Sequence, residues 1–242
     1  MANQIQEEFN LAQKKLLTTI QGTNLVKLSL DNVAMVEAMI CNDSAYLKAA
    51  DKRAGPTSKY SGSTAYWMTQ LKIFLEQNKQ LKDVYHEIIS NTVQAVDRDN
   101  STHLNADGCG RREITDRISN ILPEKLIKNL KEANLELINT ISAKTSAKTR
   151  ARVNLSFASK FCHYACFYLF EGLPEQDNYS IYDNVVKKVL PEYVNYYQLT
   201  QKNIDNYREY QKTIDEIIAK SKSHISRNGF DHLLWYYFKG RI

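Results

Sequence analysis

The sequence has few helix-breaking residues and no long apolar run. It contains eight glycines and four prolines in 242 residues, and few segments alternate with the period of two that half-buried strands need. No run of about 18 apolar residues occurs, so we expect no membrane partner. The N-terminal residues MANQIQEEFN are polar and acidic, unlike a secretory signal. The four cysteines fit free thiols, and we therefore expect a reducing cytoplasm.

Motifs that would indicate a bound cofactor are also missing. The sequence has no Walker loop, no G-x-G-x-x-G and no G-x-S-x-G. Cys162 and Cys166 would share one face of a helix, but His163 would point about 100° away from Cys162, and no fourth ligand is evident. We therefore predict no metal and no cofactor.

Apolar residues instead recur at intervals of three and four, which is the period of helices. The first face comprises Ile5, Phe9, Ala12, Leu16 and Ile20. The same spacing recurs near 33–40, 67–75, 81–96, 126–141, 204–218 and 232–238. The sequence therefore predicts an all-α protein of roughly nine or ten helices. We expect a single domain over 1–242, with a possible division near residue 120.

A basic turn (residues 143–152, AKTSAKTRAR) separates two of these helices. It carries four cations: Lys144, Lys148, Arg150 and Arg152. Small and hydroxyl residues lie between them, so that the backbone can approach a partner closely. The first N–H groups of the next helix would add to the attraction for a phosphate. The turn is either a phosphate-binding element or a solvated loop, and the net charge of +5 permits nucleic-acid binding without proving it.

The segment after this turn places one lysine in apolar surroundings. Lys160 lies within NLSFASKFC, where burial would disfavour its ammonium form and make a neutral amine available as a nucleophile. Alternatively, its stem lies on the core and its head reaches water. Asp183 follows 23 residues later, where a helix is predicted to begin. Its carboxylate could cap that helix, and a cap would also hold it in a fixed orientation.

The segment Ser180-Ile181-Tyr182-Asp183-Asn184-Val185-Val186 resembles the P-V-D-x-H-V segment of the helix-hairpin-helix DNA glycosylases, the superfamily of 8-oxoguanine glycosylase and endonuclease III. The hairpin glycines of that family are replaced by Leu155-Ser156-Phe157, and no histidine follows the aspartate. The resemblance implies a multi-helix glycosylase fold of two helical subdomains with a cleft between them, and a hairpin and catalytic segment over 143–190. It also implies a monomer that acts on double-stranded DNA with a damaged or modified base, in the cytoplasm or at a bacterial nucleoid.

The same resemblance assigns roles to residues. Lys160 would attack C1′ of a flipped nucleotide and give the enzyme AP lyase activity, and Asp183 would stabilise the oxocarbenium-like transition state. The implied DNA contacts are Lys148, Arg150, Arg152, Asn154, Ser156 and Ser159. The candidate base-pocket aromatics, each alternatively a core residue, are Tyr182, Trp67 and Trp235. Two other interpretations remain open: a non-catalytic helical DNA-binding protein, and a helical interaction protein without a nucleic-acid role.

Overall fold

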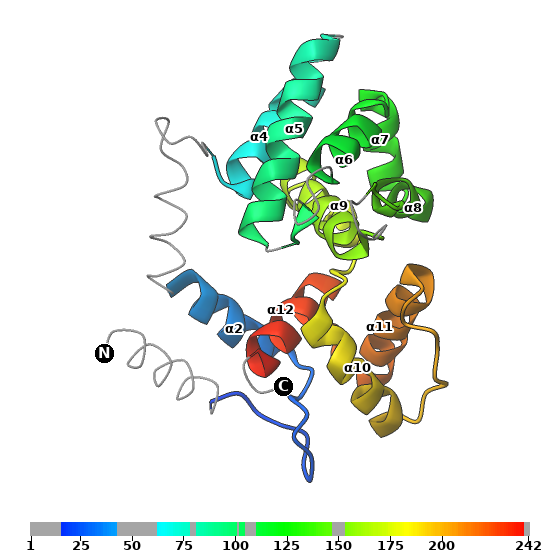
Figure 1. Ribbon diagram of the computed structural model, residues 1–242. Coiled ribbons are helices and arrows are strands. Elements are labelled where there is room, and N and C mark those ends of the chain that lie inside the picture. Colours follow the sequence, from blue (N-terminus) through cyan, green and yellow to red (C-terminus); the bar gives the residue numbers. More distant parts are fainter. Residues whose placement is uncertain are drawn as a thin grey trace, which may run out of the picture. The chain divides into compact units, whose positions relative to one another are not determined.

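The protein is built from helices (Figure 1). The computed structural model describes residues 16–42, 62–77, 81–100, 102–104, 110–146 and 153–239. These residues contain ten α-helices and one short 3-10 helix, and an isolated β-bridge pairs Thr19 with Val26. The predicted all-α class is therefore confirmed. In the same part of the chain, no helix is long and apolar enough to cross a membrane.

The first predicted helix, with its apolar face from Ile5 to Ile20, is wrong over the residues that the structure describes. Ile5, Phe9 and Ala12 lie outside the described residues, but residues 16–20 are not helical. The Ile20 N–H donates to Leu25 O at 2.8 Å, across a turn at Gly22, where φ is +76°. Residues 18–20 pair with residues 25–27 instead of forming a helix. A search for helical periodicity does not detect this kind of pairing.

The chain forms two compact units. The first comprises Met1–Leu47 and Asp183–Ile242, and the second comprises Lys48–Tyr182. The chain thus leaves the first unit, forms the second, and returns to the first at Asp183. Residue 120, where the sequence allowed a division, lies inside the second unit.

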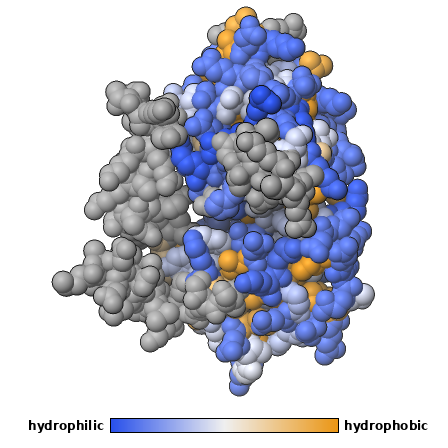
Figure 2. All heavy atoms as spheres, in the orientation of Figure 1, coloured by the Kyte–Doolittle hydropathy of each residue, from blue (hydrophilic) through white to orange (hydrophobic). Residues whose placement is uncertain are grey.

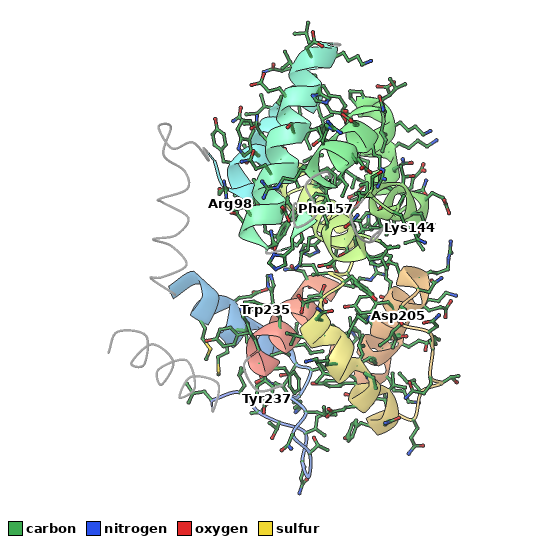
Figure 3. All side chains as sticks on the ribbon, in the orientation of Figure 1. Arg98, Lys144, Phe157, Asp205, Trp235 and Tyr237 are labelled. Carbon is green, nitrogen blue, oxygen red and sulfur yellow. The ribbon has the colours of Figure 1, made fainter. Side chains whose placement is uncertain are left out.

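The second unit is organised around a helix that is buried on several sides. Its elements are α4 (Thr64–Glu76), α5 (Lys82–Asp99), α6 (Gly110–Ser119), α7 (Pro123–Lys131), α8 (Leu135–Ser142), α9 (Leu155–Leu169) and η2 (Pro174–Asp177). Helix α9 packs against α4, α5, α7, α8 and η2. Its side chains Phe157 (Figure 3) and Phe161 are buried in this core. The apolar sequence around Lys160 therefore reflects a central helix.

Local signals in the sequence fix several helix ends. Ser63 Oγ accepts the Tyr66 N–H and caps α4. Pro123 occupies the first turn of α7, where its missing N–H leaves no bond unmade. Gly229 lies inside the first turn of α12, because Ser226 Oγ accepts the Gly229 N–H and starts the helix before the glycine.

The first unit contains α2 (Leu30–Asn42), α10 (Asn184–Tyr196), α11 (Tyr207–Ser221) and α12 (Arg227–Phe238). Helix α12 packs against the other three. The core includes Tyr193 and Phe230, whose rings meet edge to face with centroids 6.4 Å apart. The buried Tyr193 hydroxyl donates to Val26 O at 2.7 Å and so ties α10 to the segment that precedes α2. The visible surface is mainly hydrophilic, with isolated apolar residues (Figure 2).

Candidate functional site

Lys160 is buried on α9, with 9% of its surface exposed. Its Nζ donates a hydrogen bond to the backbone carbonyl of Asn100 at 3.3 Å. Asn100 is the residue that ends α5, so the ammonium lies at the negative end of that helix dipole. The apolar segment predicted a buried lysine, and this burial is confirmed. The carbonyl partner shows that the amine also has a structural use.

Asn100 is itself held by its neighbours. The Tyr164 hydroxyl donates to Asn100 Oδ1 at 2.9 Å, and Asn100 Nδ2 donates to Val96 O at 3.0 Å. Lys160 and Tyr164 are four residues apart and therefore share one face of α9. This face of α9 fixes the end of α5, and the end of α5 in turn fixes the position of the Lys160 amine.

A neighbouring face of α9 binds the segment that leads to Asp183. Ser159 Oγ accepts the Tyr182 N–H at 2.9 Å. His163 Nδ1 lies 2.9 Å from Tyr179 O, and because a carbonyl only accepts, Nδ1 carries the proton. Ser159 was predicted to contact DNA, but its side chain is fully buried and holds this segment on α9. Residues 179–182 therefore follow a path set by α9.

Asp183 begins α10 in the first unit. Its Oδ1 accepts the Val185 N–H at 2.7 Å, which confirms the predicted helix cap. A hydrogen bond joins the Tyr210 hydroxyl to the Asp183 backbone. Burial lowers the pKa of the Lys239 ammonium, and the Asp183 carboxylate partly opposes this. The cap bond therefore orients the carboxylate within its own unit.

The described ends of the basic turn are joined to each other. The Asn154 N–H donates to Ser142 O at 2.9 Å, and Asn154 Nδ2 donates to Thr145 Oγ1 at 3.2 Å. Asn154 was predicted to contact DNA, but its side chain is buried and closes this stem. The Asn154 side chain makes no cap bond to α9. The N–H groups in the first turn of a helix attract a phosphate oxygen.

The structure describes only one of the four cations of the basic turn. Lys148, Arg150 and Arg152 lie outside the described residues. Lys144 is exposed in the described stem (Figure 3), and Ser156 is half-buried in the first turn of α9.

The three candidate pocket aromatics lie on different elements. Trp67, on α4, is half-buried and meets the Tyr66 ring edge to face, with centroids 5.2 Å apart. Tyr182 is half-buried in the segment bound by α9. Trp235, on α12 of the first unit, is 37% exposed, and Lys239 Nζ lies 3.8 Å from its ring centroid (Figure 3). The structure does not unite the three in one unit.

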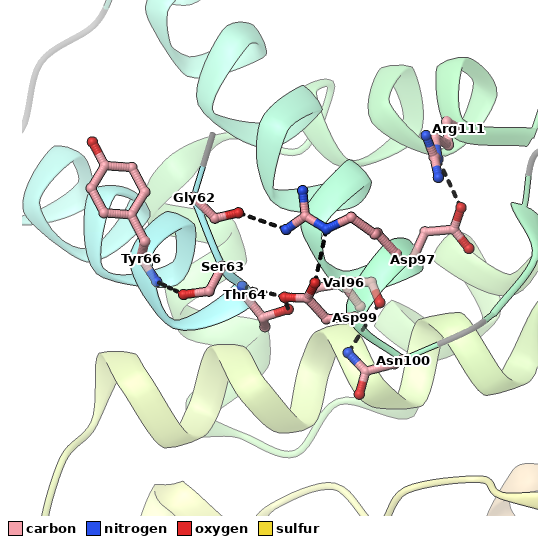
Figure 4. A network of polar contacts seen from close by, with 10 residues as sticks. Gly62, Ser63, Thr64, Tyr66, Val96, Asp97, Asp99, Asn100 and Arg111 are labelled. Carbon is pink, nitrogen blue, oxygen red and sulfur yellow. Dashed lines mark hydrogen bonds and ion pairs between the residues drawn. The ribbon is translucent and has the colours of Figure 1, made fainter. Parts of the chain in front are cut away.

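A polar network that was not predicted from the sequence lies at the end of α5 (Figure 4). The buried Asp97 carboxylate accepts bonds from the Thr102 hydroxyl at 2.6 Å, the Leu104 N–H at 2.9 Å and Arg111 Nε at 2.7 Å. Asp99 accepts the Thr64 N–H at 2.8 Å and so caps α4. The sequence D-R-D-N at the end of the amphipathic helix was the available signal, but the partners lie 5 to 35 residues away in sequence.

Among the described residues, no group of three or more histidine, cysteine and acidic side chains is arranged to hold a metal ion. Cys162 and Cys166 are buried free thiols, and burial raises the pKa of each. Raised pKa values oppose thiolate formation, which metal binding and nucleophilic attack both require.

A family model named HI_0787_N, with the description "N-terminal domain", matches residues 45–167, just over half of the chain. The chain belongs to this family. The match begins near Lys48, where the second unit begins, and ends within α9. It therefore includes Asn100 and Lys160 and stops before Asp183. No curated protein and no solved structure matches the chain.

Proposed function

We propose that the protein is a DNA base-excision glycosylase with AP lyase activity, with Lys160 as the nucleophile and Asp183 as the group that stabilises the developing cation. The observation that carries the proposal is the position of Lys160 on α9. The amine is buried there, and the adjacent Ser159 holds the Tyr182 amide, immediately before Asp183. The segment that supplies the carboxylate thus starts from the same turn of α9 that carries the amine.

The chemistry requires an amine and a carboxylate at one flipped nucleotide. The neutral Nζ attacks C1′, the bond from C1′ to the base breaks, and the base leaves with the bonding electrons and takes up a proton. The amine loses its proton as the sugar ring opens to a Schiff base. Loss of a proton from C2′ then expels the 3′ phosphate and cuts the strand. Asp183, oriented by its cap bond to Val185, would stabilise positive charge on the sugar.

Binding of the duplex is proposed to use the basic turn and the start of α9, where Asn154 makes no cap bond. Four cations in ten residues would contact phosphates and release counterions, so affinity should fall steeply with salt. The exposed Lys144 belongs to this turn. These contacts orient a duplex without reading its sequence.

Borohydride trapping tests the proposal directly. The protein is mixed with duplexes that carry single lesions, including an oxidised purine, and with duplexes that carry modified bases. We expect a covalent adduct with at least one of them, and Lys160→Gln should abolish it. Lys125→Gln, at an exposed position of α7, is the matched control and should leave the adduct unchanged. Asp183→Asn should suppress base release while the helix cap is kept, because asparagine caps as well as aspartate.

A second function, DNA binding without chemistry, is favoured by one observation. The Lys160 amine already donates to the Asn100 carbonyl, which is sufficient reason for a lysine at this position. Salt-dependent binding with no trapped adduct on any duplex would select this function. A wild-type protein that binds no DNA would exclude both.

A further inference from the structure

Two side chains of α6 hold the chain at the start of the basic turn. Both carboxylate oxygens of Glu113 accept the Ser146 N–H, each at 3.0 Å. Arg117 donates to the carbonyls of Ala143, at 2.5 Å, and Lys144, at 2.6 Å. Glu113 and Arg117 are also paired with each other, with Nη2 and Oε2 3.5 Å apart. We call these two residues the α6 clamp.

The clamp acts on a segment that is also held from its other side. Asn154 bonds to Ser142 through its backbone and to Thr145 through its side chain. Residues 142–146 therefore lie between α6 and the start of α9. The Arg117 guanidinium donates hydrogen bonds to the carbonyls of Ala143 and Lys144, just beyond the end of α8. Carbonyls at the end of a helix have no donor within the helix, so they need such a partner. Both sets of contacts fix the backbone from which the basic turn departs.

The Glu113 carboxylate distinguishes a positioning role from a simple charge effect. A glutamate beside a phosphate-binding turn repels phosphates, so electrostatics alone would disfavour it there. Its side chain is only 24% exposed, and both of its oxygens are directed at one backbone N–H. A bond from a backbone N–H to a carboxylate is roughly twice as strong as its neutral counterpart.

We propose that Glu113 and Arg117 are positioning residues of the DNA interface. They hold the backbone of residues 143–146 in a fixed position, and this position is the start of the basic turn that binds the duplex. This inference rests on the proposed interaction with DNA. It makes a prediction opposite to simple charge counting, because removal of the Glu113 charge should weaken binding.

The test measures affinity for a fluorescent 20-base-pair duplex at several salt concentrations. Glu113→Gln keeps the shape of the side chain but loses its charge. We expect affinity to fall about fivefold, as a charge-assisted bond becomes a neutral one. The control, Glu87→Gln, makes the same charge change at an exposed position on α5 and should bind as tightly as the wild type or slightly more tightly.

Arg117→Lys provides a second variant that leaves the net charge unchanged. Lysine lacks the fork that reaches two carbonyls, so affinity should again fall, while the slope of log affinity against log salt should stay the same. Exchange of the Ser146 amide hydrogen, measured without DNA, should become faster in Glu113→Gln. Unchanged thermal unfolding would show that both variants are folded.

The outcomes separate the inference from the function on which it rests. If the wild type binds no DNA, the proposed function and this inference both fall. If the wild type binds and Glu113→Gln binds as tightly or more tightly, only the inference is overturned. Weaker binding by both clamp variants, with Glu87→Gln unaffected, would establish it.

Discussion

Replacement of Lys160 by methionine separates a catalytic lysine from a structural one. Methionine keeps the long unbranched stem but removes the ammonium group and its bond to the Asn100 carbonyl. At 3.3 Å, that bond is longer than the usual range of about 2.7–3.2 Å. The bond is therefore weak for a charged donor.

The expected change in stability follows from three contributions. Loss of the bond should cost about 1.5 kcal/mol, the low end for a charged donor. Burial of the terminal methyl group should contribute about 1 kcal/mol in the other direction. The ammonium also no longer has to be taken out of water, a cost of several kcal/mol for a fully buried ion and less here, where 9% of Lys160 is exposed. We therefore expect Lys160→Met to leave the free energy of unfolding unchanged or to raise it by about 2 kcal/mol.

Urea unfolding, followed by circular dichroism, measures this change as a shift of midpoint at constant slope. Lys125→Met, at an exposed position on α7, controls for loss of a lysine without loss of a buried charge. A destabilisation of more than about 3 kcal/mol would refute the reasoning. It would mean that the ammonium is needed as a cap for α5, and the buried lysine would then require no catalytic explanation.

Three further substitutions test the contacts around the site. Asp97→Asn should destabilise the protein by about 3 kcal/mol in urea, because a buried carboxylate that pairs with Arg111 becomes neutral, and a loss under about 1 kcal/mol would contradict this. Asp183→Asn should lower the pKa of the Lys239 amine further in an NMR titration, because the carboxylate opposes the effect of burial, and an unchanged or higher pKa would argue against that interaction. Tyr193→Phe should cost about 1 kcal/mol in thermal unfolding, because its hydroxyl bonds to Val26 O, and no cost would show that water replaces the bond.

The helices could be predicted from sequence because their causes are local. Ser63 and Pro123 each start a helix through bonds to, or constraints on, residues within one turn. The segment at 16–20 could not be predicted in this way. Asn32, at the start of α2, bonds through its side chain to Thr18 and to Lys27 O, and so holds the preceding turn. The spacing of apolar residues does not reveal a polar side chain that bonds to the backbone of a preceding turn.

In the candidate site too, features with local causes could be predicted from the sequence, and features that depend on distant partners could not. The apolar sequence predicted the burial of Lys160, and the position of Asp183 predicted its cap, because both depend on neighbouring residues. The partner of the amine could not be predicted, since Asn100 is 60 residues away in sequence. Ser159 and Asn154 have the residue types of a DNA contact, but their hydrogen bonds are made inside the protein. A hydroxyl or amide group in a sequence does not reveal whether it faces solvent or backbone.

The two proposed catalytic side chains are held by independent contacts. Lys160 is held by Asn100 within the second unit, inside the family match, whereas Asp183 is held by its cap and by Tyr210 within the first unit, outside that match. Each can therefore be altered without disturbing the contacts of the other, and effects on the amine and on the carboxylate should be separable. The proposed reaction needs both groups, so in this proposal the residues matched by the family model contribute the amine, and the residue that caps α10 contributes the acid.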